Sequence, residues 1–242
     1  MRTLVISDVH ANLPALEAVL QDAGNIDAVW CLGDLVGYGP FPNQCVERIR
    51  SLPNLVSLLG NHDAAALGQI DVEAFNLEAR LSVTWMKSEL TPDALEFLNS
   101  LPEKVVVGDV TLAHGSPRNP VWEYILDVRT AAVNFRYFET QLCFIGHTHL
   151  PTVYTLAEEN DLAKVSMPGT NQGLDLAERM ILNPGSVGQP RDHDPRASYA
   201  IYFPEEHVWE YHRADYDVAS VQQRILDLGL PPRHAIRLSE GW

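Results

Sequence analysis

Histidine and carboxylate side chains recur in five short motifs along the chain, and they are side-chain types that bind metal ions. In chain order the motifs are Asp8-Val9-His10, Gly33-Asp34, Gly60-Asn61-His62-Asp63, His114 and Gly146-His147-Thr148-His149. They supply seven oxygen and nitrogen ligands, which is enough for two adjacent metal ions. Each motif alone is a weak signal, but five in series are hard to explain without metal.

The ligand types indicate which ions would bind. Nitrogen and oxygen ligands without thiolate suit manganese, iron or zinc and leave positions open for water. Asp34 could bridge two ions, and the neutral amide oxygen of Asn61 would limit negative charge. Two divalent ions about 3.5–4 Å apart can hold an in-line displacement and activate water near neutral pH. We therefore expect two divalent ions, manganese first, with iron, zinc or nickel as alternatives.

Most of these motifs follow an apolar run typical of a buried strand. Such runs are Leu4–Ile6, Ala28–Leu32, Leu55–Leu59 and Leu142–Ile145, and strand, loop and helix alternate between them. This alternation predicts parallel βαβ units, whose strands would deliver the motifs to one sheet edge. The glycines at positions 33, 60 and 146 would let the backbone approach bound ions without a Cβ clash.

The remaining sequence predicts helices and then antiparallel strands. Two helices are expected between Val72 and Leu101, the second capped by Thr91-Pro92, followed by a hairpin turning at Gly108-Asp109. Later elements are a helix near 130–138, strands at 152–156, 163–167, 180–183, 198–203 and 208–212, and a helix over 218–228. The acidic run Glu158–Asp161 is interpreted as a hairpin tip, and the tail from Pro231 as loosely docked.

These elements predict an α/β fold in which two mixed β-sheets pack face to face with helices outside, a four-layer α-β-β-α sandwich. No linker, repeat or low-complexity stretch is evident, so residues 1–242 are expected to form a single domain.

Composition excludes several classes of function. The chain has 242 residues, 46% hydrophobic and 20% charged, with a formal net charge of -15. This balance disfavours nucleic-acid binding, nuclease activity and adhesion to anionic membranes, all of which rely on lysine and arginine. No apolar run has the length of a membrane span. Three cysteines without C-x-x-C spacing and the absence of a signal-like start favour the cytoplasm.

The motif series D-x-H, G-D, G-N-H-[DE], H and G-H-x-H resembles that of the calcineurin-like metallophosphoesterase superfamily over about residues 1 to 215. The resemblance implies a double β-sandwich and two metal sites that share Asp34. The first would use Asp8, His10, Asp34 and His149, and the second Asp34, Asn61, His114 and His147. A metal-bridging hydroxide would attack phosphorus, and His62 would stabilise the transition state or protonate the leaving oxygen.

One motif departs from the Ser/Thr protein phosphatase branch, which continues G-D-x-x-D-R-G. Gly37 and Tyr38 stand where that branch has its aspartate and arginine, so His62 needs another partner, for which Asp63 or a water is available. Tyr38-Gly39-Pro40 and Asn183–Gly188 resemble instead the small bacterial branch of phosphodiesterases and phosphatases.

We therefore predict a dimetal hydrolase of small phosphodiesters or phosphomonoesters, with nucleotides as a candidate class. The alternatives are a Ser/Thr protein phosphatase, a dinucleoside-polyphosphate hydrolase and a non-catalytic metal-binding scaffold. Candidate substrate-binding residues are Asn61, His62, Tyr38 and Arg191, although a solvated surface role is the simpler interpretation of Arg191. Trp122 and Tyr124 could stack on a base, but core packing explains them more simply.

Overall fold

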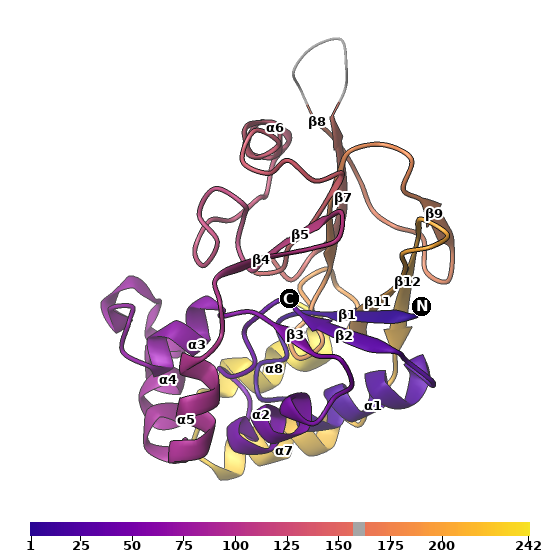
Figure 1. Cartoon of the computed structure of the whole chain (residues 1–242). Helices are drawn as coiled ribbons and strands as arrows, with labels where there is room; N and C mark the ends of the chain where they lie inside the picture. The colour runs from indigo at the N-terminus through magenta and orange to yellow at the C-terminus, as the bar shows by residue number, and fades with distance from the viewer. Residues whose placement is uncertain (157–162) are drawn as a thin grey trace.

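Two six-stranded β-sheets form the centre of the computed structural model, which describes residues 1–156 and 163–242 (Figure 1). The first sheet has the strand order β3-β2-β1-β11-β12-β9. Strands β1, β2 and β3 run parallel, and β11 joins β1 in antiparallel register. The bounds are β1 Thr3–Ile6, β2 Ala28–Cys31, β3 Val56–Ser57, β9 Gly173–Asp175, β11 Ala197–Phe203 and β12 Val208–Ala214.

The second sheet has the order β4-β5-β6-β10-β7-β8. Strands β5, β6 and β10 are parallel, and β4, β7 and β8 pair antiparallel at the two sides. The bounds are β4 Lys104–Val107, β5 Val110–Ala113, β6 Leu142–Phe144, β7 Pro151–Leu156, β8 Ala163–Ser166 and β10 Met180–Pro184.

Side-chain alternation along the strands explains why both sheets are covered on both faces. In β1, Val5 belongs to the core between the sheets, whereas Leu4 and Ile6 pack against helices on the outside. In β6, Phe144 points into the inter-sheet core and Cys143 into the outer core under α6. Period-two alternation in which both faces are apolar requires a layer on each side, which gives four layers.

Helices α1, α2, α4 and α5 contribute to the core on the outer face of the first sheet, and α6 covers the second. Figure 1 shows these helices on opposite sides of the paired sheets. The bounds are α1 Leu13–Ala23, α2 Pro42–Arg50, α3 Asn61–Ala66, η1 Val72–Ala74, α4 Leu77–Glu89, α5 Pro92–Asn99, α6 Val128–Asn134, α7 Val218–Asp227 and α8 Pro232–Glu240. The predicted four-layer sandwich of two mixed sheets is therefore confirmed.

The tail from Pro231 was the main error in the predicted elements. It is not loosely docked but forms α8, which packs on α7 through a small core that includes Val221, Ile225 and Leu238. The short elements α3 and β9 were also not predicted. The expected hairpin tip Glu158–Asp161 lies outside the described residues.

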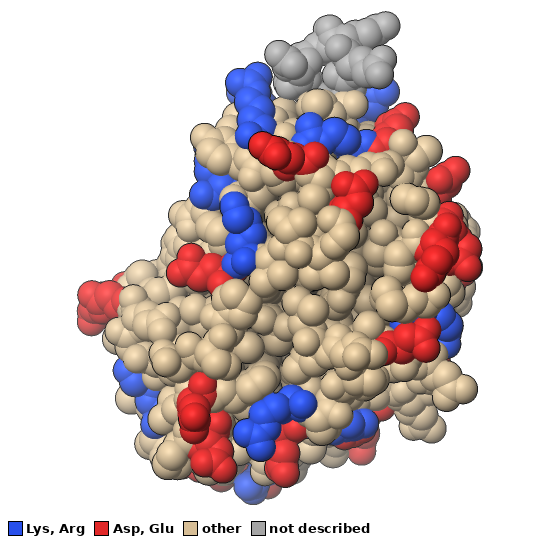
Figure 2. Space-filling model, viewed as in Figure 1, with Lys and Arg blue, Asp and Glu red and all other residues tan. Residues whose placement is uncertain are grey.

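Charges are spread over the surface without a dominant sign on the face shown in Figure 2, where acidic and basic side chains are interspersed. None of the helices in the described part of the chain has the length and apolar character needed to cross a membrane.

Candidate metal centre

All seven predicted ligands converge where the two sheets meet, on loops that leave the carboxyl ends of strands. Asp8 and His10 follow β1, Asp34 follows β2, and Asn61 follows β3. From the second sheet, His114 follows β5, and the loop that holds His147 and His149 follows β6. Each of the seven side chains is buried, with at most 2% of its surface exposed. The fold thus gathers residues that follow five different strands into one buried cluster.

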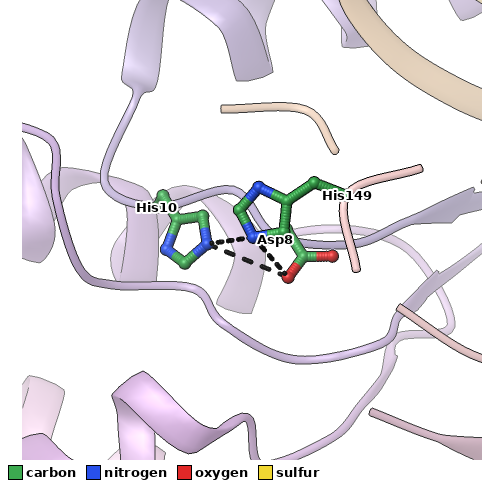
Figure 3. A group of neighbouring side chains, drawn as sticks. All are labelled: Asp8, His10 and His149. Atoms are coloured by element: carbon green, nitrogen blue, oxygen red, sulfur yellow. Dashed lines mark hydrogen bonds and ion pairs between the residues drawn. The ribbon is translucent and has the colours of Figure 1, made fainter. Parts of the chain in front are cut away.

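The first group contains Asp8, His10 and His149 (Figure 3). The Nε2 atoms of the two histidines lie 3.0 Å apart. The Asp8 Oδ1 atom is 3.3 Å from the Nε2 atom of His149 and 3.8 Å from that of His10. The Asp34 Oδ2 atom lies 3.6 Å from the His10 Nε2 atom, so this carboxylate borders the group as well.

The second group lies on the other side of the Asp34 carboxylate. The Nε2 atom of His114 is 3.4 Å from Asp34 Oδ2, 3.0 Å from Asn61 Oδ1 and 3.1 Å from His147 Nδ1. One carboxylate oxygen therefore adjoins both groups. The structure brings together the same two ligand sets that the family resemblance implied, with Asp34 between them.

Backbone carbonyls engage the ring nitrogen of each histidine that points away from the cluster. The Nδ1 atoms of His10, His114 and His149 lie 3.1, 2.9 and 2.6 Å from the carbonyl oxygens of Val36, Leu32 and Gln189. For His147 the outward atom is Nε2, 3.2 Å from the Trp122 carbonyl oxygen. An N–H donated to each carbonyl leaves the inward nitrogen as a lone-pair donor, the arrangement usual for metal-binding histidines.

This donor set fits divalent cations. Inward lone pairs 3.0 Å apart repel each other unless a positive charge lies among them, and Asp8 Oδ1 has no hydrogen-bond donor in the described structure. Burial lowers the pKa of His10, His147 and His149 well below the usual value, so these rings are neutral and could bind a metal ion. Burial opposes protonation of His114 too, but the Asp34 charge and hydrogen bond raise its pKa to about 9. The cluster thus attracts a cation, and a proton on His114 would have to leave when metal binds.

The backbone at the centre adopts unusual conformations that sequence reasoning did not foresee. Asp8, His10, Asp34, His147 and His149 all have positive φ angles, between 48° and 66°. Non-glycine residues rarely adopt this left-handed conformation, and such strain concentrates at functional sites. Asp8 and His10 lie beyond the end of β1 and not within the strand. Left-handed turns, not strand alternation, bring the ligands together.

His62 lies in the first turn of α3 beside the first group, with its ring 5.0 Å from that of His10. Its Nδ1 atom is buried and has no hydrogen-bond partner within the described ranges. Asp63 does not serve as that partner, because its carboxylate accepts the backbone N–H groups of Leu35, Val36 and Gly60. Of the two partners considered from the sequence, Asp63 is therefore ruled out.

Gly37 explains why the protein phosphatase arrangement is absent. Its φ angle is +109°, and a Cβ atom there would lie 2.7 Å from His62 Nδ1. No side chain at this position could fit without moving His62. The glycine predicted to break the protein phosphatase motif thus makes room for the candidate catalytic ring.

The candidate substrate-binding residues Tyr38 and Arg191 lie together next to His62. The Tyr38 ring is 4.4 Å from the His62 ring and 4.6 Å from the His10 ring. The guanidinium carbon of Arg191 lies 5.9 Å from the centre of the Tyr38 ring. Tyr124 stacks on His147 at 3.7 Å with 44% of its surface exposed, so core packing does not describe it.

Two further residues support the centre without belonging to the predicted ligand set. The amide of Asn183 donates to the Gly146 carbonyl at 2.7 Å and to Thr148 Oγ1 at 3.0 Å, which holds the loop that carries His147 and His149. The Asn183 side-chain oxygen also accepts the N–H of Gly185, as a turn would require. The second residue is Gln189, whose backbone carbonyl orients His149. The sequence leaves open whether Asn183 holds a backbone near the metals or forms a turn before Pro184, and the structure has both kinds of contact; no sequence signal marked Gln189.

Comparisons with known proteins agree on the kind of fold and family. Residues 1–206 match the calcineurin-like phosphoesterase superfamily domain. A protein of Methanocaldococcus jannaschii described as uncharacterized is 40% identical over 237 residues, which are 94% of this chain and 93% of that protein. The crystal structure of a metallophosphoesterase from Sphaerobacter thermophilus superimposes with a TM-score of 0.92 at 48% identity, covering 100% of this chain and 99% of that one.

A more distant similarity concerns enzymes named for a nucleotide substrate. A symmetrical bis(5'-nucleosyl)-tetraphosphatase of Salmonella paratyphi B is 37% identical over 110 residues, which are 42% of this chain and 36% of that enzyme. The similarity thus spans about a third of that relative.

Proposed function

Because this chain belongs to the calcineurin-like phosphoesterase superfamily, we propose that it is a hydrolase of phosphoric esters that works with two divalent metal ions. The observation that carries the proposal is the pair of ligand groups on either side of Asp34, with His62 beside them. Manganese is the first candidate ion, and iron, zinc and nickel suit the same ligands.

The distances between the proposed ligand atoms divide them into two sets, one for each metal ion. Asp8, His10 and His149 would hold one ion, Asn61, His114 and His147 the other, and Asp34 both. Bound ions would neutralise the phosphate and activate water for attack on phosphorus.

Side chains near the metal centre would orient the substrate and donate a proton to the leaving oxygen. The ring of His62, held by α3 and by the contact with Tyr38, would donate a hydrogen bond to a phosphate oxygen or to the leaving oxygen. The Asp34 Oδ1 atom accepts the backbone N–H of His62 at 2.8 Å, so His62 and the shared ligand are positioned as one unit. Arg191 and Tyr38 would contact the bound phosphoester from the same side.

A nucleotide is a second candidate substrate, and a cavity favours it. A cavity of about 340 Å³ is lined by Trp122 and by the polar side chains of Gln69, Glu103 and Asn119. Leu59 and Ala64, which flank the motif Gly60–Asp63 in the sequence, also line it. Trp122 also touches the centre, through its carbonyl at His147. An apolar wall with a few amide and carboxylate groups suits a nucleobase. The partial similarity to bis(5'-nucleosyl)-tetraphosphatases also favours a nucleotide substrate.

We also propose a reducing compartment such as the cytoplasm, because Cys31, Cys45 and Cys143 are all free and buried.

The decisive experiment strips the protein with chelator and assays bis- and mono-nitrophenyl phosphate with manganese, zinc, nickel and magnesium. We expect activity only with added metal and a loss of about 100-fold or more in His62→Ala. His207→Ala, which changes an exposed histidine, is the matched control and should keep full activity. The ratio of diester to monoester rates would choose between phosphodiesterase and phosphatase. Fully metallated protein that hydrolyses neither ester would refute the proposal.

A further inference from the structure

The helices α7 and α8, which lie beyond the residues matched by the family domain, reach the metal centre. His234 of α8 is buried, and its ring lies 4.9 Å from the ring of Tyr38. A small cavity between them is lined by His10, Tyr38, His234 and Leu238. The C-terminal hairpin therefore forms one wall beside the candidate catalytic residues.

Arg237 follows His234 by three residues, so both side chains lie on the same face of α8. The guanidinium carbon of Arg237 is 5.4 Å from the Trp242 ring. Burial lowers the pKa of Arg237, and the charge of Arg191 lowers it further. Two arginines from distant parts of the chain thus repel each other across this wall.

Neither arginine has the partners that such groups normally have. The Nε atoms of Arg191 and Arg237 are buried and without a hydrogen-bond partner in residues 1–156 and 163–242. Over the same residues, neither guanidinium lies within ion-pair distance of a carboxylate. Six other arginines in these residues do have acidic partners: Arg48 with Glu17, Arg80 with Glu73, Arg118 with Glu123, Arg196 with Asp194, Arg213 with Asp192, and Arg233 with Glu78. The polar partners of Arg191 are uncharged: the side-chain oxygen of Gln189, at 3.1 Å, and the side chain of Tyr38.

Partly buried like charges without counterions are costly, and a bound anion would relieve the cost. Guanidinium groups suit phosphate in particular, since two N–H groups can bind two phosphate oxygens at once. Neither arginine lies within ion-pair distance of Asp8 or Asp34, whereas Tyr38 contacts the rings of both His10 and His62. Tyr38 therefore separates the arginine pair from the predicted metal ligands.

We propose that Arg191 and Arg237 form a subsite for a second phosphate group, adjacent to the phosphate that reacts at the metal centre. This inference rests on the proposed function and narrows its substrate class to compounds with two linked phosphates, such as esters of diphosphate. Arg237 is then a specificity residue supplied by the C-terminal hairpin.

The test compares two non-hydrolysable ligands on the metal-loaded full chain, methylenediphosphonate with two phosphorus groups and methylphosphonate with one. Calorimetry at constant free metal would give both dissociation constants for the wild type, Arg237→Gln and Arg233→Gln. Arg233 is the matched control, because it lies on the same helix and against the same Trp242 ring but is paired with Glu78. Circular dichroism and thermal melting would check folding, and Arg237→Lys would replace Arg237→Gln if the latter did not fold.

We expect the wild type to bind the diphosphonate at least tenfold more tightly than methylphosphonate. Arg237→Gln should remove about tenfold of that preference, about 1.4 kcal/mol. Arg233→Gln should keep it. Equal losses for both ligands in Arg237→Gln would place Arg237 on the reacting phosphate and overturn the subsite, as would an unchanged preference or an equal effect in Arg233→Gln.

The two proposals fail in different ways. An Arg237-dependent preference in a protein that hydrolyses no ester would sink the proposed activity and leave the subsite standing. Metal-dependent ester hydrolysis without this preference would support the proposed activity and overturn the subsite.

Discussion

The Nε2 atoms of His10 and His149 face each other at 3.0 Å, although 139 residues separate the two in the chain. Both rings have their Nδ1 atoms at backbone carbonyls, and both are buried. Only the packing of the two sheets against each other brings these two nitrogens together, and a cation between them would join the sheets. Metal binding should therefore contribute to stability as well as to chemistry.

Removing metal should lower the melting temperature. A ligand that binds only the folded state at 100 times its dissociation constant adds about 2.7 kcal/mol. Because the ligands come from loops of both sheets, we expect chelation to lower the melting temperature by several degrees and added manganese to restore it. Differential scanning calorimetry would measure this. An identical melting temperature with and without every tested ion would contradict the proposed ligand set.

Asp34→Asn should affect both ions, because Asp34 Oδ2 lies beside both ligand groups. The amide keeps the size but loses the negative charge, so we expect fewer than two metal ions per chain and at least about a 100-fold loss of activity. Elemental analysis of the purified protein would count the ions. Asp22→Asn, which removes a carboxylate that bonds Tyr199 far from the centre, is the control. Full metal occupancy in Asp34→Asn would show that this carboxylate is not a shared ligand.

Gly37→Ala should damage the centre through His62. The new Cβ atom would lie 2.7 Å from His62 Nδ1, in addition to the strain of alanine at a positive φ angle. Gly108→Ala shares only the strain, because its Cβ atom would have nothing within 4 Å. We expect each variant to lose about 1–2 kcal/mol of stability from the backbone, and only Gly37→Ala to lose most of its activity with metal retained. Equal activity in both would mean that His62 moves without consequence.

His234 should make stability depend on pH. Burial and the nearby charges of Arg237 and His62 lower its pKa from 6.5 to about 4, against a smaller opposing effect of the Glu78 carbonyl and carboxylate. The unfolded chain therefore binds a proton that the folded chain does not, between about pH 6.5 and pH 4. The stability that His234 contributes is fully present above pH 6.5. It is lost as the pH falls towards 4, and the loss is at most about 3 kcal/mol.

Urea unfolding of the wild type and of His234→Gln across this range would measure that contribution. Glutamine cannot titrate, so the wild type should lose more stability than the variant as the pH falls. If the free energy of unfolding had the same pH dependence in both proteins, His234 would not take up a proton on unfolding. The other buried histidines remain in both proteins and cancel in the comparison.

Local sequence patterns determined much of the architecture. The apolar runs before Asp8, Asp34, Asn61 and His147 form strands, and the Thr91-Pro92 cap begins α5, with Thr91 Oγ1 accepting the Ala94 N–H. Such elements follow from short-range physics, because a buried strand needs consecutive apolar residues and a helix needs a cap. The unbroken motif series indicated the family, and the family match agrees.

Other features depended on contacts between distant parts of the chain. The tail after Pro231 was not recognised as α8, because its apolar side pairs with α7 and with Tyr38 and no local pattern shows that partner. The partner of His62 could not be read from the sequence either, since Asp63 is taken up by backbone groups of a loop 27 and 28 residues earlier in the chain.

By itself, then, the sequence determined which side chains could bind metal and which strands would carry them, because residue type and local periodicity are properties of short segments. The tertiary structure alone decided that five predicted ligands adopt left-handed backbone angles, that Gly37 makes room for His62, and that the charge of Arg191 acts on Arg237. These relationships depend on the packing of two sheets and a C-terminal hairpin, whose contacting residues lie too far apart in the chain for any local pattern to encode.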